Sequence, residues 1–174
     1  MLADVQIRPF QSDDLNNLEK LYKAAFPDEN LLPLVRELAE SSDVVCAWIA
    51  ELAGSIVGHV AFTRCAVGAK EGVYLLGPLA VSPDYQRRGL GQRLIELGFA
   101  ELRERRATLV CVLGDPAYYS RSGFGAEGFV QPPFKLPYEW DGAWQSTTLD
   151  ERKDSLSGQL VVPPVWNKAA LWQP

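Results

Sequence analysis

The chain has 174 residues, 47% of them hydrophobic, with 17 basic and 22 acidic side chains and a net charge of −5. Its length and apolar content predict a single globular domain, residues 1–174, with a sizeable core. The acidic balance argues against a nucleic-acid partner, because neutralising phosphates requires an excess of clustered basic residues.

The sequence also argues against membranes and metals. No stretch reaches the ~18 apolar residues of a membrane span, and residues 1–6 lack the basic start and apolar run of a signal peptide, so we expect a cytoplasmic protein with no membrane partner. Cys46, Cys65 and Cys111 lie in apolar runs without Cys-x-x-Cys spacing, which predicts buried thiols in a reducing compartment. The single histidine, His59, has no close cluster of metal ligands, so we expect no metal cofactor.

The chain up to residue 81 predicts four strands and two helices. Ser12 is the expected N-cap of the first helix, with Asp13 and Asp14 in the first turn, and Pro27 ends that helix. We expect the loop between the two helices to form one lip of a substrate site. The expected strands are residues 5–8, 44–52, 55–66 and 72–81, and the expected helices are residues 12–26 and 31–39.

The chain after residue 89 begins with a long amphipathic helix pattern. An apolar run then predicts a strand buried on both faces. Asp115 is expected to cap a short helix that starts at Pro116. The expected helix is residues 90–106 and the expected strands are residues 108–113, 124–130 and 159–162, the last of them within a C-terminal segment, 131–174, rich in proline and aromatic residues.

The segment Gln86-Arg87-Arg88-Gly89-Leu90-Gly91, which we call the phosphate loop, lies between an apolar strand and the long helix pattern. Its glycines carry no side chain to shield their N–H groups, and they open a helix whose first donors lack partners. The two arginines add positive charge at the same place. The segment therefore predicts a ligand that carries phosphates.

Two common phosphate-binding motifs do not fit this segment. A dinucleotide fingerprint needs a third glycine at the position of Leu94. A nucleoside-triphosphate loop needs Gly-Lys-Ser or Gly-Lys-Thr after a four-residue gap, and the sequence has no such string.

Gln86, Gly89 and Gly91 match a Gln/Arg-x-x-Gly-x-Gly/Ala loop, and two flanking stretches extend the match. Residues 75–85 are similar to a central strand that runs into such a loop, and residues 113–124 contain Gly-Asp-Pro-x-Tyr-Tyr followed by Gly-Phe. Together they resemble the GNAT superfamily of acyl-CoA-dependent N-acyltransferases, nearest to a bacterial subgroup of uncharacterised predicted N-acetyltransferases. The resemblance covers roughly residues 44–128.

The resemblance implies an α/β (α+β) GNAT-type fold and acetyl-CoA as co-substrate. The expected fold is a mostly antiparallel mixed sheet of about seven strands with about four helices, splayed between the fourth and fifth strands. The backbone of Leu79, Ala80 and Val81 would pair with the pantetheine arm, and the Val81 N–H would point at the thioester carbonyl. Leu79 and Val81 as plain core residues stays an open alternative. The cofactor-binding residues that the resemblance implies are Leu79, Ala80, Val81, Gln86, Arg87, Arg88, Gly89, Leu90, Gly91, Gln92 and Tyr119.

Tyr119 matches the family tyrosine that donates a proton to the departing CoA thiolate. A tyrosine with a pKa of about 10 stays protonated above the range of a leaving thiol, near 8–9, so it suits a general acid. A packing role for the ring is the alternative, and the neighbouring Tyr118 is a second candidate for the acid.

Several residues are candidates for a general base and for the acceptor site. The strand 73–81 holds no carboxylate, where many family members place a glutamate, so the candidates left are Glu71, His59, Glu139 and Asp141. An aromatic wall with carboxylates would suit a cationic amine, whereas a tail that covers a sheet edge or makes a homodimer contact is an open alternative. The expected acceptor contacts are His59, Phe134, Tyr138 and Glu139, with Trp140 and Trp144 in the same aromatic segment.

The expected function is direct transfer of an acetyl group from acetyl-CoA to a primary amine of a small molecule or peptide. One alternative is a non-catalytic acyl-CoA sensor, which would not need Tyr119. Another is an acyl-enzyme route through Cys111 or Cys65 with His59, which would need an activated thiolate, and the buried-looking positions of these cysteines weigh against it.

Overall fold

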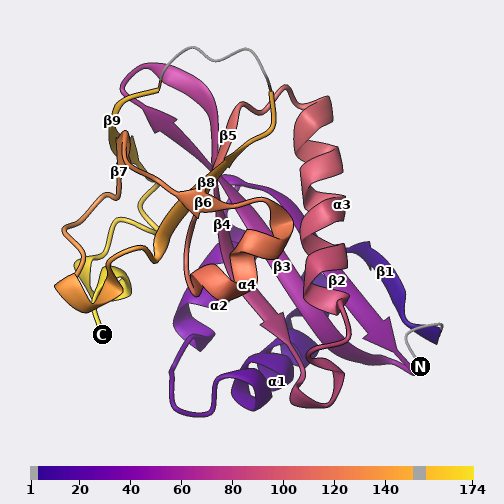
Figure 1. Cartoon of the computed structure of the whole chain (residues 1–174). Coiled ribbons are helices and arrows are strands. Elements are labelled where there is room, and N and C mark those ends of the chain that lie inside the picture. The colour runs from indigo at the N-terminus through magenta and orange to yellow at the C-terminus, as the bar shows by residue number, and fades with distance from the viewer. Residues whose placement is uncertain (1–3, 151–155) are drawn as a thin grey trace. The chain divides into compact units, whose positions relative to one another are not determined.

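The strands of the computed structural model form a mixed, mostly antiparallel sheet in the order β1-β2-β3-β4-β5-β8-β6, with β9 beside β3 and β7 beside β9 (Figure 1). Residues 4–150 and 156–174 are described. The strands are β1 Gln6–Pro9, β2 Val44–Leu52, β3 Ser55–Val67, β4 Lys70–Val81, β5 Leu109–Leu113, β6 Gly125–Ala126, β7 Val130–Gln131, β8 Trp144–Thr148 and β9 Gly158–Val161. The α-helices are α1 Leu15–Ala25, α2 Leu32–Glu40, α3 Leu90–Glu104 and α4 Pro116–Tyr119. The 3-10 turns are η2 Ser12–Asp14, η3 Pro83–Tyr85, η4 Ser120–Ser122, η5 Tyr138–Trp140 and η6 Ala169–Trp172.

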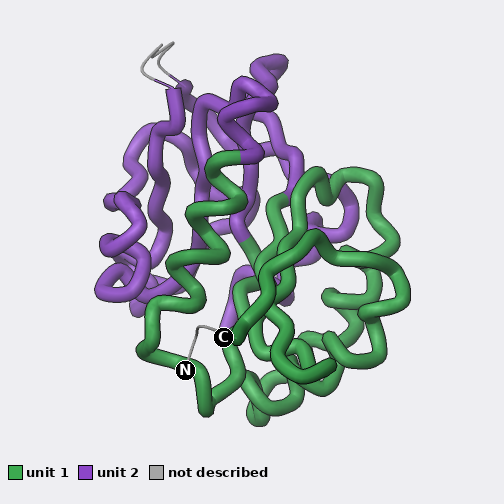
Figure 2. Tube along the Cα trace, turned by 90° about the vertical axis from the view of Figure 1, so that its right-hand side faces the viewer, with its two compact units in different colours: residues 1–62, 77–100 green, residues 63–76, 101–174 purple. Residues whose placement is uncertain are grey.

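The architecture confirms the expected mixed α/β class, with four strands before the phosphate loop. The chain forms two compact units, residues 1–62 with 77–100 and residues 63–76 with 101–174, drawn in green and purple in Figure 2. Strands β3 and β4 and helix α3 each contribute residues to both units. The parallel pairing of β4 with β5 covers Val73–Leu75 opposite Leu109–Cys111, and β4 runs on to Val81.

Helices cover both faces of β3 in the first unit. His59 of β3 contacts Tyr22 of α1, whereas Gly58, on the other face, lies against α3. A Cβ at Gly58 would come within 3.0 Å of Leu94 Cδ1, so glycine allows this close approach. The core beneath α1 and α2 is built from Leu18, Leu21, Tyr22, Val35, Ile49, Ile56 and Ala80.

The core of the second unit is centred on β5, which confirms the strand expected to be buried on both faces. Four of its five residues are buried, and it pairs antiparallel with β8 from Leu109–Thr148 to Leu113–Trp144. The C-terminal segment belongs to this core: Trp172 is 2% exposed and packs edge-to-face on Trp144, with ring centroids 5.8 Å apart.

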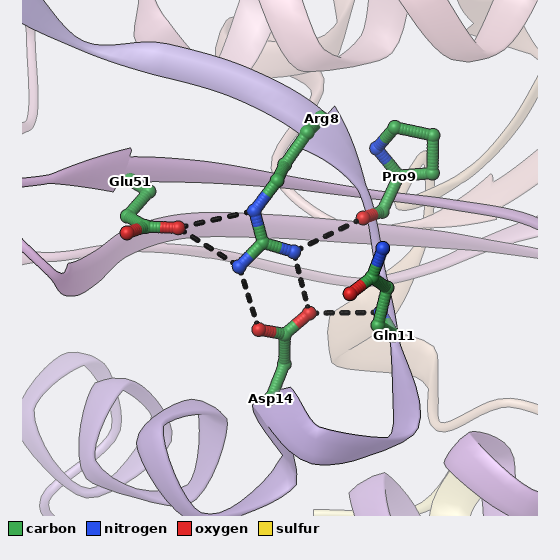
Figure 3. Close-up of polar contacts among 5 residues, drawn as sticks. All are labelled: Arg8, Pro9, Gln11, Asp14 and Glu51. Atoms are coloured by element: carbon green, nitrogen blue, oxygen red, sulfur yellow. Dashed lines mark hydrogen bonds and ion pairs between the residues drawn. The ribbon is translucent and has the colours of Figure 1, made fainter.

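Two expectations about local structure are wrong. Ser12 does not cap α1; it begins the turn η2, which closes when Asp14 accepts a hydrogen bond from the Gln11 N–H at 2.8 Å. The same carboxylate is held by Arg8 at 2.7 and 2.8 Å, as Figure 3 shows. Asp14 is therefore committed to tertiary contacts rather than to a solvent-exposed first helical turn.

Residues 124–130 do not form one strand. Glu127 turns the chain, because its Oε1 accepts from the N–H groups of Phe129 and Val130 at 2.6 and 2.9 Å. The result is two short strands, β6 and β7, on different neighbours, β8 and β9. Strand β8 was not predicted, because its residues after Trp144 are all polar.

Candidate functional site

The phosphate loop contains two residues with an unusual backbone conformation. Arg87 and Gly89 both adopt left-handed conformations, with φ of 58° and 80°. A left-handed conformation costs an L-residue such as Arg87 roughly 1–2 kcal/mol. Such strain gathers at ligand-binding turns, where left-handed residues help successive N–H groups form a concave anion site. Gln86 to Gly89 are exposed, and the loop ends at the first turn of the 15-residue helix α3.

The loop is fastened to the end of β4. The Gln86 side chain donates from Nε2 to the Val81 carbonyl at 3.0 Å, and the Ser82 N–H donates to the Val57 carbonyl at 2.9 Å. The Arg88 guanidinium lies over the Tyr85 ring, 5.6 Å from its centroid. The loop and the strand end thus form one connected element in the first unit.

The three strand residues expected to line the pantetheine arm differ in burial. Ala80 is 1% exposed and belongs to the core beneath α1 and α2. Leu79 and Val81 are half-buried. Of the three residues, only Ala80 therefore has the burial of a plain core residue.

Tyr119 lies at the end of α4 in the second unit. Asp115 caps this helix by accepting from the Ala117 N–H at 2.9 Å, and Pro116 is its first residue, both as predicted. The Tyr119 ring packs edge-to-face on Phe124 and Tyr118, with centroids 5.7 and 5.0 Å away. Burial raises the pKa of Tyr119, so its phenol is protonated at neutral pH.

The Tyr119 hydroxyl has no hydrogen-bond partner within residues 4–150 and 156–174. Tyr119 is half-buried, so this phenol is available to donate a hydrogen bond to a bound group. Tyr118 is half-buried, and burial raises its pKa as well.

His59 is buried and neutral. It is 5% exposed, its Nδ1 lies 2.8 Å from the Tyr22 hydroxyl, and Phe10 packs on its edge with ring centroids 6.1 Å apart. Burial lowers the pKa of His59 to about 3. An imidazole with so low a pKa is a weak base at neutral pH.

The aromatic C-terminal segment is not uniform. Tyr138 is 89% exposed and Glu139 beside it is exposed, whereas Phe134 is half-buried. Trp144 is buried in the core, where its indole N–H donates to the Val130 carbonyl at 2.8 Å. Trp144 therefore cannot share an exposed aromatic wall with Tyr138.

The cysteines are buried, as predicted. Burial raises the pKa of Cys111, which keeps its thiol protonated and a poor nucleophile. Among the described residues, no three His, Cys, Asp or Glu side chains gather as metal ligands, and no helix is long and apolar enough to cross a membrane.

Two residues near Tyr119 were missed as parts of the site. Gly114 lies directly under the Tyr119 ring, and the Gln145 side chain, 1% exposed, donates to the Gly114 carbonyl at 3.0 Å. Gly114 was visible in the Gly-Asp-Pro motif. Gln145 carried no local signal, because it is a polar residue in a segment noted for its aromatic residues.

Comparison with known proteins agrees with this arrangement. The family model "Acetyltransferase (GNAT) family" matches residues 15–124. An uncharacterised N-acetyltransferase of Escherichia coli K12, YjhQ, is 32% identical over 156 residues, which are 84% of this chain and 86% of YjhQ.

Two solved structures extend the likeness over nearly the whole chain. E. coli YhbS in complex with CoA superposes with a TM-score of 0.84 and 26% identity, over 95% of this chain and 93% of that one. A Brucella melitensis GNAT acetyltransferase in complex with acetyl-CoA gives a TM-score of 0.74 and 28% identity, over 92% and 97%. The chain therefore belongs to the GNAT acetyltransferase family.

Proposed function

We propose that this protein transfers an acetyl group from acetyl-CoA directly to a primary amine of a small molecule or peptide. The observation that carries the proposal is the phosphate loop, whose left-handed Arg87 and Gly89 lie between the end of β4 and the start of α3. The N–H groups of this loop, with Arg87 and Arg88, would hold the CoA pyrophosphate. The two solved relatives that bind CoA or acetyl-CoA support the choice of ligand.

In the proposed reaction the backbone of Leu79 to Val81 holds the pantetheine arm. The neutral amine attacks the thioester carbonyl, and the Val81 N–H stabilises the negative charge that grows on the carbonyl oxygen. One such donor is worth roughly 3–4 kcal/mol in acyl-transfer sites. The C–S bond then breaks, the thiolate takes the Tyr119 proton, and the nitrogen loses its proton to solvent as the amide forms. Its protonated state and unpartnered hydroxyl suit Tyr119 to this role.

The proposed mechanism uses no strong side-chain base. His59 is neutral and buried against Tyr22, and Glu71 is exposed at the start of β4. The amine would therefore bind in its neutral form. We expect kcat/KM to rise with pH until the ammonium group of the unbound acceptor has lost its proton. Tyr138 and Glu139 on η5, both exposed, stay proposed acceptor contacts, as do Phe134 and His59.

The experiment that tests this proposal measures CoA thiol release from acetyl-CoA with a panel of amines. The panel holds an alkyl monoamine, a polyamine, an amino sugar and a dipeptide with a free N-terminus. Tyr119→Phe should lower kcat by about 10²-fold with the best acceptor, the lower end of general acid catalysis, and should change acetyl-CoA binding little. Cys111→Ala should leave kcat unchanged.

Two results would contradict the proposal. If Cys111→Ala abolishes turnover while Tyr119→Phe does not reduce it, an acyl-enzyme route replaces direct transfer. If the chain binds acetyl-CoA tightly but no amine releases CoA, the non-catalytic sensor is the better description.

A further inference from the structure

We infer that Gly114 and Gln145 are positioning residues for the proposed general acid: Gln145 fixes the Gly114 backbone, and the Tyr119 ring rests on that glycine. This inference rests on the proposed function, in which Tyr119 protonates the CoA thiolate. The contacts that carry it all lie within the second unit.

The first contact is between Gly114 and the Tyr119 ring. A Cβ at Gly114 would overlap Tyr119 Cε2 and would lie 3.1 Å from its Cδ2. Non-bonded carbon atoms settle at about 3.5–4.0 Å, so the ring would have to move by roughly 1 Å to admit a methyl group. Gly114 is not in the left-handed region, so the ring, rather than the backbone conformation, requires glycine here.

The second set of contacts holds Gly114 in place. Its N–H donates to the Ala143 carbonyl at 3.0 Å, and its carbonyl accepts from Gln145 Nε2 at 3.0 Å. The same Gln145 nitrogen donates to the Ala143 carbonyl at 3.2 Å. Both partners of this amide nitrogen are acceptors, so the geometry itself assigns the donor end of the amide. Gln145 thus ties the end of β5 to the turn before β8.

The burial of Gln145 makes these contacts costly to lose. Its side chain is 1% exposed, and a buried polar group without a partner is destabilising. Replacing Gln145 would leave the Gly114 carbonyl without this donor. The backbone at Gly114 could then shift. Tyr119 would follow, because its own N–H donates to the Asp115 carbonyl at 3.0 Å.

Position matters for a proton donor more than for a packing ring. A misplacement of about 1 Å in a catalytic group lowers turnover by as much as 10²-fold. Gly114→Ala should therefore lower kcat by roughly 10- to 100-fold, with KM for acetyl-CoA changed less than about threefold. Gln145→Met, which keeps the length of the side chain and removes the donor, should act in the same direction.

The test combines kinetics with a probe of the ring itself. The protein is labelled with 3-fluorotyrosine, and the Tyr119 resonance is assigned by its loss in Tyr119→Phe. This resonance should shift in Gly114→Ala and in Gln145→Met. Two variants serve as controls, and in both the chemical shift of Tyr119 should equal that of the wild type. They are Gly128→Ala, where a Cβ meets nothing within 4 Å, and Gln159→Met, which removes an exposed hydrogen bond to Pro133. kcat is measured with the best amine of the panel.

A double-mutant cycle separates positioning from a general structural effect. The double variant Gly114→Ala/Tyr119→Phe should have a kcat no more than about twofold below that of Tyr119→Phe alone, because the displaced ring no longer donates a proton. If Gly114→Ala and Gln145→Met leave both the resonance and kcat unchanged, or if the double variant loses the full product of the single effects, the inference is wrong. If Tyr119→Phe itself leaves kcat unchanged, the proposed acid fails instead, and the resonance still reports whether Gly114 and Gln145 position the ring.

Discussion

The Tyr22 hydroxyl and His59 Nδ1 lie 2.8 Å apart in the core between α1 and β3. The Tyr22 ring also meets His59 edge-to-face, with centroids 5.7 Å apart, and it stacks with Phe26, with centroids 5.9 Å apart. A histidine enclosed in this way is held neutral, and that state links the stability of the fold to pH.

Stability should fall as pH falls from about 6.5 toward 3. Burial lowers the pKa of His59 from 6.5 to about 3, so the unfolded chain binds a proton that the folded chain does not. The stabilisation is fully present above pH 6.5 and is lost as pH falls through this window, with a slope of up to ~1.4 kcal/mol per pH unit. Urea unfolding of wild type and His59→Gln at several pH values measures it; equal pH dependence in the two would contradict the account.

A second pH effect should come from Asp14 at lower pH. Hydrogen bonds from Arg8 hold the pKa of Asp14 below its usual value of 3.8, so its contribution to stability is present above that value and is lost as pH falls further. Asp14→Asn at neutral pH should lower the free energy of unfolding by roughly 1.5–3 kcal/mol, the usual range for hydrogen bonds to charged groups. Glu101→Gln, in the more exposed i,i+4 pair with Arg105, should cost about 0.5 kcal/mol or less. Equal losses in urea unfolding would contradict the special role of the Arg8 contacts.

Gly89→Ala should weaken acetyl-CoA binding by about tenfold or more, because a methyl group would shield the N–H groups that the proposed site offers to phosphate. Gly54→Ala is a matched control. Gly54 and Gly89 have φ of 79° and 80°, and neither Cβ would meet an atom within 4 Å. The two variants should lose similar stability, roughly 1–2 kcal/mol. Calorimetry should find weaker binding in Gly89→Ala alone, and unchanged binding in both variants would remove the loop from the ligand site.

Trp172→Ala should be strongly destabilising even though it lies two residues from the C-terminus. Its indole N–H donates to the Trp166 carbonyl at 3.0 Å, and its ring contacts Trp144 and Trp166. Truncating a buried tryptophan costs roughly 3–5 kcal/mol. Tyr138→Ala, at a residue 89% exposed, should change stability by less than about 0.5 kcal/mol. Thermal unfolding compares them, and similar melting temperatures would show that the C-terminal segment contributes little.

The elements predicted well are those with local signals. Asp115 and Pro116 predict α4, because they are typical of an N-cap and a first helical position. The glycines of the phosphate loop predict the start of α3. The alternating and continuous apolar runs placed β2 to β5 to within a few residues. Each of these signals lies within a few positions of the element that it specifies.

The parts that the sequence did not reveal depend on distant residues. Asp14 is diverted from helix capping by Arg8, which is held in turn by Glu51, 43 residues further along the chain. β8 forms although four of its residues are polar, because its partner β5 is buried and Gln145 finds backbone acceptors. The contact between Gly114 and the Tyr119 ring likewise follows from how α4 folds back over the end of β5.

Thermal unfolding of the full chain with and without acetyl-CoA, with ATP and NAD as controls, shows whether the protein binds this co-substrate selectively. At a hundredfold excess over Kd, ligand binding to the native state adds about 2.7 kcal/mol. For a chain of this length that corresponds to a rise in Tm of roughly 5–11 °C. Binding of acetyl-CoA at the phosphate loop predicts this rise with acetyl-CoA alone, and a smaller one in Gly89→Ala. An unchanged Tm with acetyl-CoA, or an equal rise with ATP or NAD, would contradict it.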